Sequence, residues 1–275
     1  MNFGRIDLDG VGSPSAIAER IHSLAPDLPP KFDLEALCTA LDIISIAETD
    51  TSGFEAALIM DGHAATGSIL LASGRPPERH RFSIGHELGH FLIEGHAPRP
   101  GERHGCNLDH FHLQDTREQD RRRRIEAEAN RFAGQLLMPP TKLRRMITAR
   151  EPDLVEIVSL AAEFGVSKEA MARGYVEASR HTLEVIVTRH GRIERVYRQP
   201  DVFPWIEPRR GAKVPFDSIV ADDPPAVRGI SEIAECDPAV WLSEYAARRV
   251  EGLTEQVMWQ SQGYAMVLLN ADLGE

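Results

Sequence analysis

The chain has 275 residues, 42% of them hydrophobic, and a formal net charge of -11. Such a length and apolar share are ordinary for a globular protein with one large domain or a few small ones, and the acidity disfavours broad attraction to nucleic acid. The three cysteines are widely spaced and form no CxxC pair, which argues against a disulfide framework. The sequence contains no apolar run of membrane-spanning length and its first ten residues do not resemble a secretory signal, so we expect a cytoplasmic protein.

The first 72 residues predict short helices followed by a small sheet. Apolar residues at helical spacing indicate helices over residues 15–24 and 32–41, the second with Asp33 placed as a cap. Apolar runs then predict three strands, at residues 43–47, 54–60 and 68–72. The turn signal Asp61-Gly62 lies between the last two strands, so we expect a hairpin or short sheet there.

Residues 79–94, RHRFSIGHELGHFLIE, predict a helix with one apolar stripe and a defined end at Gly95. His86 and His90 lie four residues apart, so both imidazoles can face one ion, with Glu87 beside them. This is the HExxH arrangement, in which two neutral histidines hold zinc and the glutamate acts as general base on zinc-bound water. The competing interpretation is a core helix that carries two histidines without a metal.

A zinc site that performs chemistry needs a third protein ligand and an open position for water. Residues 124–140, RIEAEANRFAGQLLMPP, predict a second buried helix whose apolar stripe is flanked by Glu126 and Glu128. Either glutamate can reach the metal. We favour Glu126, because Asn130 lies on the same side, where its amide can hold the outer nitrogen of a ligating histidine. Glu128 remains the alternative ligand, and both glutamates being solvated is the metal-free interpretation.

The motifs FSIGHELGHFL and EAEANRFAGQLLMPP, in this order, resemble the ImmA/IrrE family of bacterial metallo-endopeptidases. The resemblance covers the first two thirds of the chain. It implies a zinc-dependent endopeptidase that cleaves a helix-turn-helix repressor, often encoded beside it, and so relieves repression in a stress or mobile-element response. It also implies that His86, His90 and Glu126 are metal ligands and that Glu87 is the catalytic glutamate.

The segment between the two motifs contains His104, Cys106, His110 and His112. These residues lack a paired metal-binding spacing, so a second metal site is the weaker interpretation. We expect the segment to form a rim over the substrate, because long connections in compact domains are often binding loops. One of His96, His110 and His112 is a candidate for stabilising the oxyanion.

Residues 151–180 predict two helices separated at Gly165, a pattern that resembles the turn of a helix-turn-helix. The second helix supplies few basic side chains, Lys168 and Arg173, and neighbouring glutamates offset them. We therefore expect no direct DNA binding. Strand-like runs at 183–188, 192–198 and 264–270, with a helix at 240–250, predict a small C-terminal module.

The predicted fold is α+β in three parts. A zincin-like metallopeptidase domain with a small sheet and the HExxH helix spans residues 1–150, a helix-turn-helix-like segment spans 151–180, and an α+β module for sensing or substrate docking spans 181–275. The predicted function is zinc-dependent cleavage of a helix-turn-helix repressor. The alternative is a non-hydrolytic regulator that binds DNA or a repressor and holds a structural zinc. Structural sites are usually closed by four protein ligands, which disfavours this alternative.

Overall fold

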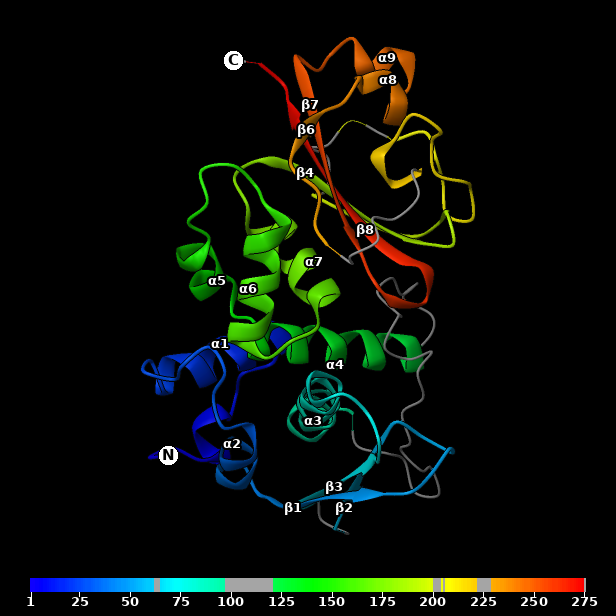
Figure 1. Ribbon diagram of the computed structural model, residues 1–275. Coiled ribbons are helices and arrows are strands. Elements are labelled where there is room, and N and C mark those ends of the chain that lie inside the picture. Colours follow the sequence, from blue (N-terminus) through cyan, green and yellow to red (C-terminus); the bar gives the residue numbers. More distant parts are fainter. Residues whose placement is uncertain (62–64, 97–120, 200–203, 205, 222–228, 275) are drawn as a thin grey trace. The chain divides into compact units, whose positions relative to one another are not determined.

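The computed structural model describes residues 1–61, 65–96, 121–199, 204, 206–221 and 229–274. The chain divides into two compact units. The N-terminal unit comprises Met1–Pro139 and Glu163–Ser167, and the C-terminal unit comprises Pro140–Ala162 and Lys168–Glu275. Both units contain helices and a sheet, so the chain has a mixed α+β fold (Figure 1).

The N-terminal unit begins with three short helices, η1 (Arg5–Leu8), α1 (Pro14–Leu24) and α2 (Leu34–Ala40). Side-chain caps explain where the last two begin. The Ser13 hydroxyl accepts a hydrogen bond from the Ala16 amide, and the Asp33 carboxylate accepts one from the Ala36 amide. Each cap satisfies a backbone donor that the first turn of a helix leaves unpaired.

Three strands form the sheet of this unit, in the order β1 (Ile43–Thr49), β3 (Gly67–Ala72), β2 (Ala56–Met60). β2 and β3 pair in antiparallel orientation, as the sequence predicts, and β1 pairs with β3 in parallel. Asp61 holds the connection between β2 and β3, because its carboxylate accepts hydrogen bonds from the Ala65 and Thr66 amides. The rest of the expected turn, residues 62–64, lies outside the described residues.

Two long helices, α3 (Pro77–Leu92) and α4 (Arg121–Leu137), carry the candidate site. α3 lies between the three-stranded sheet and α4 (Figure 1). α1 packs on α4 as well, and the His22 Nε2 donates a hydrogen bond to the Leu136 carbonyl over 2.8 Å. Because α3 is covered on two sides, even its polar residues His86, Glu87 and His90 are buried.

The C-terminal unit contains α5 (Pro140–Met146), most of α6 (Leu154–Phe164), α7 (Lys168–Ala178) and a five-stranded antiparallel sheet. The order of its strands is β5 (Arg192–Arg198), β4 (Thr182–Arg189), β8 (Tyr264–Asp272), β7 (Gly252–Trp259), β6 (Ala234–Glu235). The predicted strands at 183–188, 192–198 and 264–270 are therefore β4, β5 and β8.

Two features of the C-terminal unit differ from the sequence prediction. The helix predicted at 240–250 is replaced by α8 (Pro238–Trp241) and α9 (Glu244–Ala247), because Ser243 has an extended backbone and caps a new helix. The second difference is β7, which the sequence does not reveal because polar residues interrupt its apolar pattern. Gln256 is nonetheless buried, and its side chain bonds to the Leu154 amide, the Asp153 carboxylate and the Ser231 carbonyl.

Different elements cover the two faces of the five-stranded sheet. On one face, Glu169 of α7 accepts hydrogen bonds from Arg195 and Tyr197 of β5. The other face, called the Trp241 face below, packs in a buried cluster around Trp241. Its strand residues are Ile186, Ile193, Leu253, Val257, Ala265, Val267, Leu269 and Ala271.

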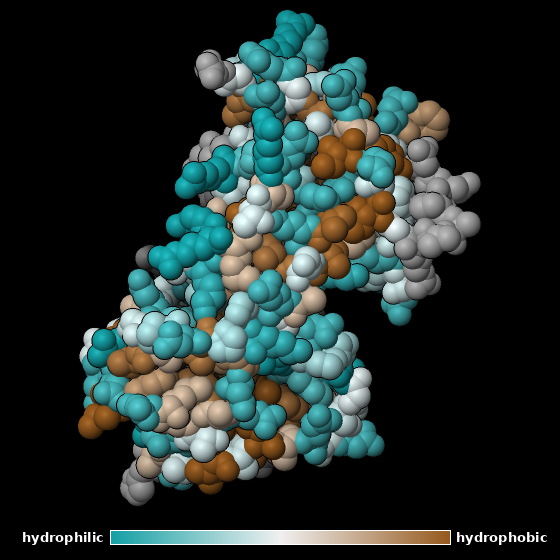
Figure 2. Space-filling view, turned by 60° about the vertical axis from the view of Figure 1, so that its left-hand side comes forward, coloured by the Kyte–Doolittle hydropathy of each residue, from teal (hydrophilic) through white to brown (hydrophobic). Residues whose placement is uncertain are grey.

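The surface mixes hydrophilic and hydrophobic residues on the face that Figure 2 shows. Large apolar side chains that are exposed lie on separate segments of the two units; examples are Ile44, Ile59, Phe216 and Tyr245. Among the described residues, no helix has the length and apolarity that a membrane crossing requires.

Candidate metal centre

The close approach of α3 to α4 depends on two glycines of the HExxH helix. A Cβ atom on Gly89 would lie 2.9 Å from a ring carbon of Phe132, and one on Gly85 would lie 3.5 Å from the Ala133 Cβ. Ala129 and Ala133 supply small, fully buried surfaces on α4. The helices therefore pack closely enough for short side chains on both of them to meet.

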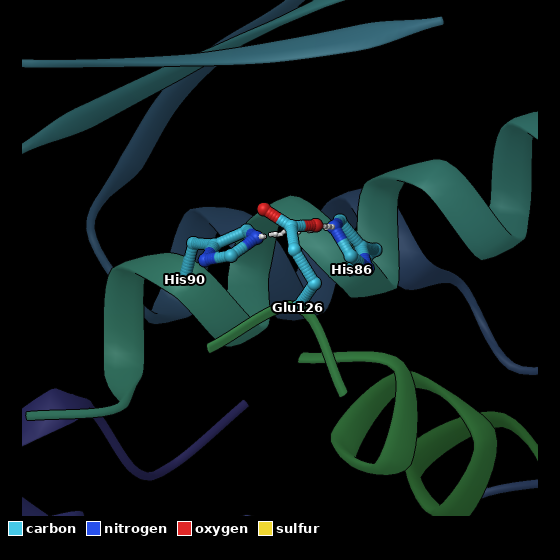
Figure 3. A group of neighbouring side chains, drawn as sticks. All are labelled: His86, His90 and Glu126. Carbon is cyan, nitrogen blue, oxygen red and sulfur yellow. Dashed lines mark hydrogen bonds and ion pairs between the residues drawn. The ribbon is translucent and has the colours of Figure 1, made fainter. Parts of the chain in front are cut away.

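His86, His90 and Glu126 meet at this contact (Figure 3). The two histidine Nε2 atoms are 3.0 Å apart. One carboxylate oxygen of Glu126 lies 3.3 Å from the His86 Nε2 and 3.7 Å from the His90 Nε2. All three side chains are buried, and each contributes one potential ligand atom.

These separations fit a shared metal ion. Atoms that bind one tetrahedral zinc at about 2.0–2.1 Å are separated from one another by roughly 3.3 Å. The three observed distances, 3.0, 3.3 and 3.7 Å, bracket that value. Imidazole nitrogen and carboxylate oxygen are also ordinary zinc donors, so the residues fit the ion in both geometry and chemistry.

Glu126 is held in the ionised form that a metal ligand requires. Burial opposes its ionisation, but its contacts with His86 and then His90 outweigh burial and keep the pKa of this carboxyl well below its usual range. The carboxylate is thus available to a cation without first losing a proton.

Asn130 fixes the orientation of His86. Its side-chain oxygen lies 3.0 Å from the His86 Nδ1, on the opposite side of the ring from Glu126. An amide oxygen accepts, so the Nδ1 carries a proton, and the Nε2 is the ring nitrogen that is left to bind a metal in place of its contact with Glu126. Sequence analysis placed Asn130 in this position from its four-residue spacing to Glu126.

Glu128 has a different partner from Glu126. Its carboxylate accepts a 2.9 Å hydrogen bond from the His96 Nε2 and another from Arg124. His96 is buried, and burial lowers its pKa to about 4 despite the neighbouring carboxylate. The structure therefore brings Glu126 to the two histidines and Glu128 to His96.

No sequence pattern predicts the His96–Glu128 contact, because the two residues are 32 positions apart and share no motif. The rings of His96 and His90 are also neighbours, with centroids 5.2 Å apart. The other histidines considered for the oxyanion, His110 and His112, lie outside the described residues, as do His104, Cys106 and the predicted rim between residues 97 and 120.

Glu87 follows His86 on α3 and is completely buried. It lies beside the cluster in sequence but is not one of the three residues whose donor atoms converge. A buried HExxH helix joined by a carboxylate from a second helix is the arrangement of a metallopeptidase-type domain.

Comparison with known proteins agrees with this class. Residues 43–174 match the family model Peptidase_M78, described as the IrrE N-terminal-like domain. The resemblance to the ImmA/IrrE family is thereby confirmed, and the chain carries an IrrE N-terminal-like domain of this family.

The comparison with solved structures concerns the fold. A structure described as a Mycobacterium tuberculosis transcriptional regulator aligns with a TM-score of 0.55 and 13% sequence identity. The alignment covers 94% of this chain and 75% of the other. No curated protein matches the sequence.

Proposed function

We propose that the protein is a zinc-dependent endopeptidase whose substrate is a helix-turn-helix repressor, and that cleavage relieves repression in a stress or mobile-element response. The observation that carries this proposal is the convergence of His86, His90 and Glu126 next to Glu87. The match of residues 43–174 to a peptidase family supports the same class of reaction.

In the proposed reaction, His86, His90 and Glu126 hold the ion. A bound zinc would polarise the scissile carbonyl and acidify a coordinated water. Glu87 accepts a proton from the attacking water and returns it to the leaving amine. Glu87 is buried on the same helix as His86 and His90, directly after His86, which suits a base that acts on water held at the metal.

The number of ligands favours hydrolysis over the non-hydrolytic alternative. Within the described residues, the cluster that can hold a metal consists of His86, His90 and Glu126. Structural zinc sites are usually closed by four protein ligands, whereas catalytic sites keep one position for water or substrate. Three ligands beside a glutamate are what hydrolysis requires.

The contacts of α7 support a protein substrate rather than DNA. The helix buries Met171, Tyr175 and Val176, and Glu169 near its first turn is engaged by β5. Arg173 is paired with Glu177 over 2.9 Å. A recognition helix needs free basic side chains for phosphates and base edges, and the described face of α7 offers few.

The proposal includes a cytoplasmic location and the division into a peptidase domain (1–150), a helix-turn-helix-like segment (151–180) and a C-terminal module for sensing or docking (181–275). In this division the catalytic groups belong to the first part, and selection of the repressor belongs to the other two.

A cleavage assay tests the function. The zinc-loaded chain is mixed with the helix-turn-helix repressor encoded nearest to it, alongside a chelated sample and the Glu87→Gln variant. We expect discrete cuts by the wild type, and retained zinc with a loss of turnover of at least about a hundredfold in Glu87→Gln. Cleavage by Glu87→Gln at the wild-type rate would refute the general-base role. An intact repressor with fully zinc-loaded wild type would favour the non-hydrolytic regulator.

A further inference from the structure

Glu184 of β4 is a fully buried carboxyl group in the interior of the C-terminal sheet. It lies opposite Leu269 of β8 on one side and Arg198 of β5 on the other. Directly opposed residues of antiparallel strands point to the same face, and Leu269 belongs to the Trp241 face. Glu184 therefore points into the Trp241 face, two positions from Ile186.

A second buried carboxyl group on the same face, that of Glu255, differs from Glu184 because it has hydrogen-bond partners. Glu255 of β7 lies opposite Leu269 from the other side. It accepts hydrogen bonds from the Ser218 hydroxyl (2.5 Å), the Ile219 amide and the Trp241 indole N–H (both 3.4 Å). These contacts attach the segments that contain Ser218 and Trp241 to the sheet.

Glu184 receives no such contacts from the described residues. Both of its carboxylate oxygens are buried, and neither has a hydrogen-bond partner among these residues. Most buried polar side chains have at least one hydrogen-bond partner, because losing hydration without a replacement is costly for a neutral group and more costly for a charge. A neutral Glu184 is compatible with this position, whereas an ionised one is strongly disfavoured.

Few charged groups in the described part of the chain act on Glu184. On its own face, the charged residues of the neighbouring strands are Arg198 on β5 and Glu255 beyond Leu269. Described charged residues of the segments that cover this face point outward and are exposed; they are Glu207, Arg209, Arg210, Lys213, Asp217, Asp237, Glu244, Arg248 and Arg249. Burial raises the pKa of Glu184 to about 8, and the opposing effect of Arg198 is smaller.

We propose that Glu184 is a proton-sensitive lock of the C-terminal module. When the carboxyl is protonated, the Trp241 face stays closed. Loss of the proton to solvent leaves a buried charge that receives no hydrogen bond from the described residues and only a partial offset from Arg198, and the carboxylate gains hydration when the face opens. The module thereby responds to pH through a residue outside the metal centre, whether or not the N-terminal unit hydrolyses peptides.

The direction of the pH effect follows from the linkage between protonation and opening. In the open state Glu184 titrates near its ordinary value of 4.5, and in the closed state near about 8. The closed state binds more protons between these values, so its stability is complete below pH 4.5 and decreases as the pH rises toward 8. Over this interval the ratio of closed to open molecules falls about tenfold for each pH unit.

Hydrogen–deuterium exchange of the full chain between about pH 5 and 8 tests the proposal, with protection corrected for the intrinsic exchange rate. The peptides followed are those of β4, β5 and β8. In the wild type, we expect protection to fall by up to about tenfold per pH unit. The Glu184→Gln variant, which cannot ionise, should keep its protection. The control Glu235→Gln removes an exposed acid of the same module and should behave as wild type.

A decrease of the same size in Glu184→Gln and wild type would overturn the proposal, because other groups would then cause it. Constant protection in the wild type would overturn it as well. If Glu184→Gln did not fold, Glu184→Met would replace it, since methionine fills a similar space without a polar group.

Discussion

At the scale of single residues, the two glutamates of the EAEAN motif differ in what they contact. Glu126 meets His86 and His90, whereas Glu128 meets His96 and Arg124. Both residues are glutamates on the same helix, so their different contacts result from their surroundings and not from their chemistry. The structure thus separates two candidates that the spacing alone left open.

This difference predicts that two matched substitutions will affect zinc affinity to very different extents. Glu126→Gln removes a carboxylate ligand from the cluster and should weaken zinc binding by more than about a hundredfold, since losing a residue that only holds a ligand in place already costs about 10–100-fold. Glu128→Gln should leave zinc affinity within a few fold of wild type. Competition with a chromophoric chelator measures both. The ligand assignment would have to move to Glu128 if the second variant lost the metal and the first kept it.

Asn130 is expected to act on zinc through His86. Replacing Asn130 by alanine removes the oxygen that accepts a hydrogen bond from the His86 Nδ1. The His86 ring can then rotate or change tautomer. We expect a loss of zinc affinity of about 10–100-fold without global unfolding. The same chelator titration, accompanied by circular dichroism, checks this. Unchanged affinity would show that His86 is oriented by other contacts.

The features that the sequence did not predict are those that depend on residues far apart in the chain. Asn130 was placed because it is four residues from Glu126 on one helix. His96 meets Glu128 across 32 residues, and Glu184 becomes notable only because its environment supplies no partner. Neither property is encoded in a short motif, and both depend on how distant segments pack.

At the scale of elements, the packing of α3 on α4 determines whether the cluster can form. Gly89 lies against Phe132, and Gly134 on α4 has nothing within 4 Å of the position of a Cβ. Both glycines are inside helices, where glycine is less favourable than alanine by about 1 kcal/mol. Their different surroundings give a matched pair for testing the contact.

Gly89→Ala should destabilise the N-terminal unit, because the new methyl overpacks the contact by about 1–3 kcal/mol and the helix propensity gain only partly offsets this. Gly134→Ala should stabilise it by about 0.5–1 kcal/mol. Urea unfolding monitored by circular dichroism compares the two. Equal effects of the same sign would show that α3 and α4 do not approach closely at Gly89.

Helical spacing predicted the N-terminal elements well because their apolar residues point to one side. The strands β4, β5 and β8 were also visible as apolar runs. β7 was not, since Glu255 and Gln256 are polar residues that the fold buries and satisfies with distant partners. The predicted helix at 240–250 was wrong because the capping residue Ser243 divides it.

At the scale of the whole molecule, the net charge and the contacts of α7 both disfavour DNA binding. The chain carries a formal charge of -11, and α7 engages β5 through Glu169. We therefore expect no specific DNA binding at physiological salt. Fluorescence anisotropy with duplex DNA upstream of the target gene measures this. Binding at nanomolar concentration that weakens steeply with added salt would contradict the expectation, since such a slope reports phosphate contacts.

The most direct test of the metal centre is the X-ray absorption spectrum of the zinc-loaded full chain. We expect two imidazole nitrogens and one carboxylate oxygen at about 2.0–2.2 Å, with one further light atom from solvent. The Glu126→Gln variant should lose this pattern. A sulfur neighbour at about 2.3 Å, or four protein ligands, would indicate a closed structural site elsewhere in the chain and would refute the proposed metal centre.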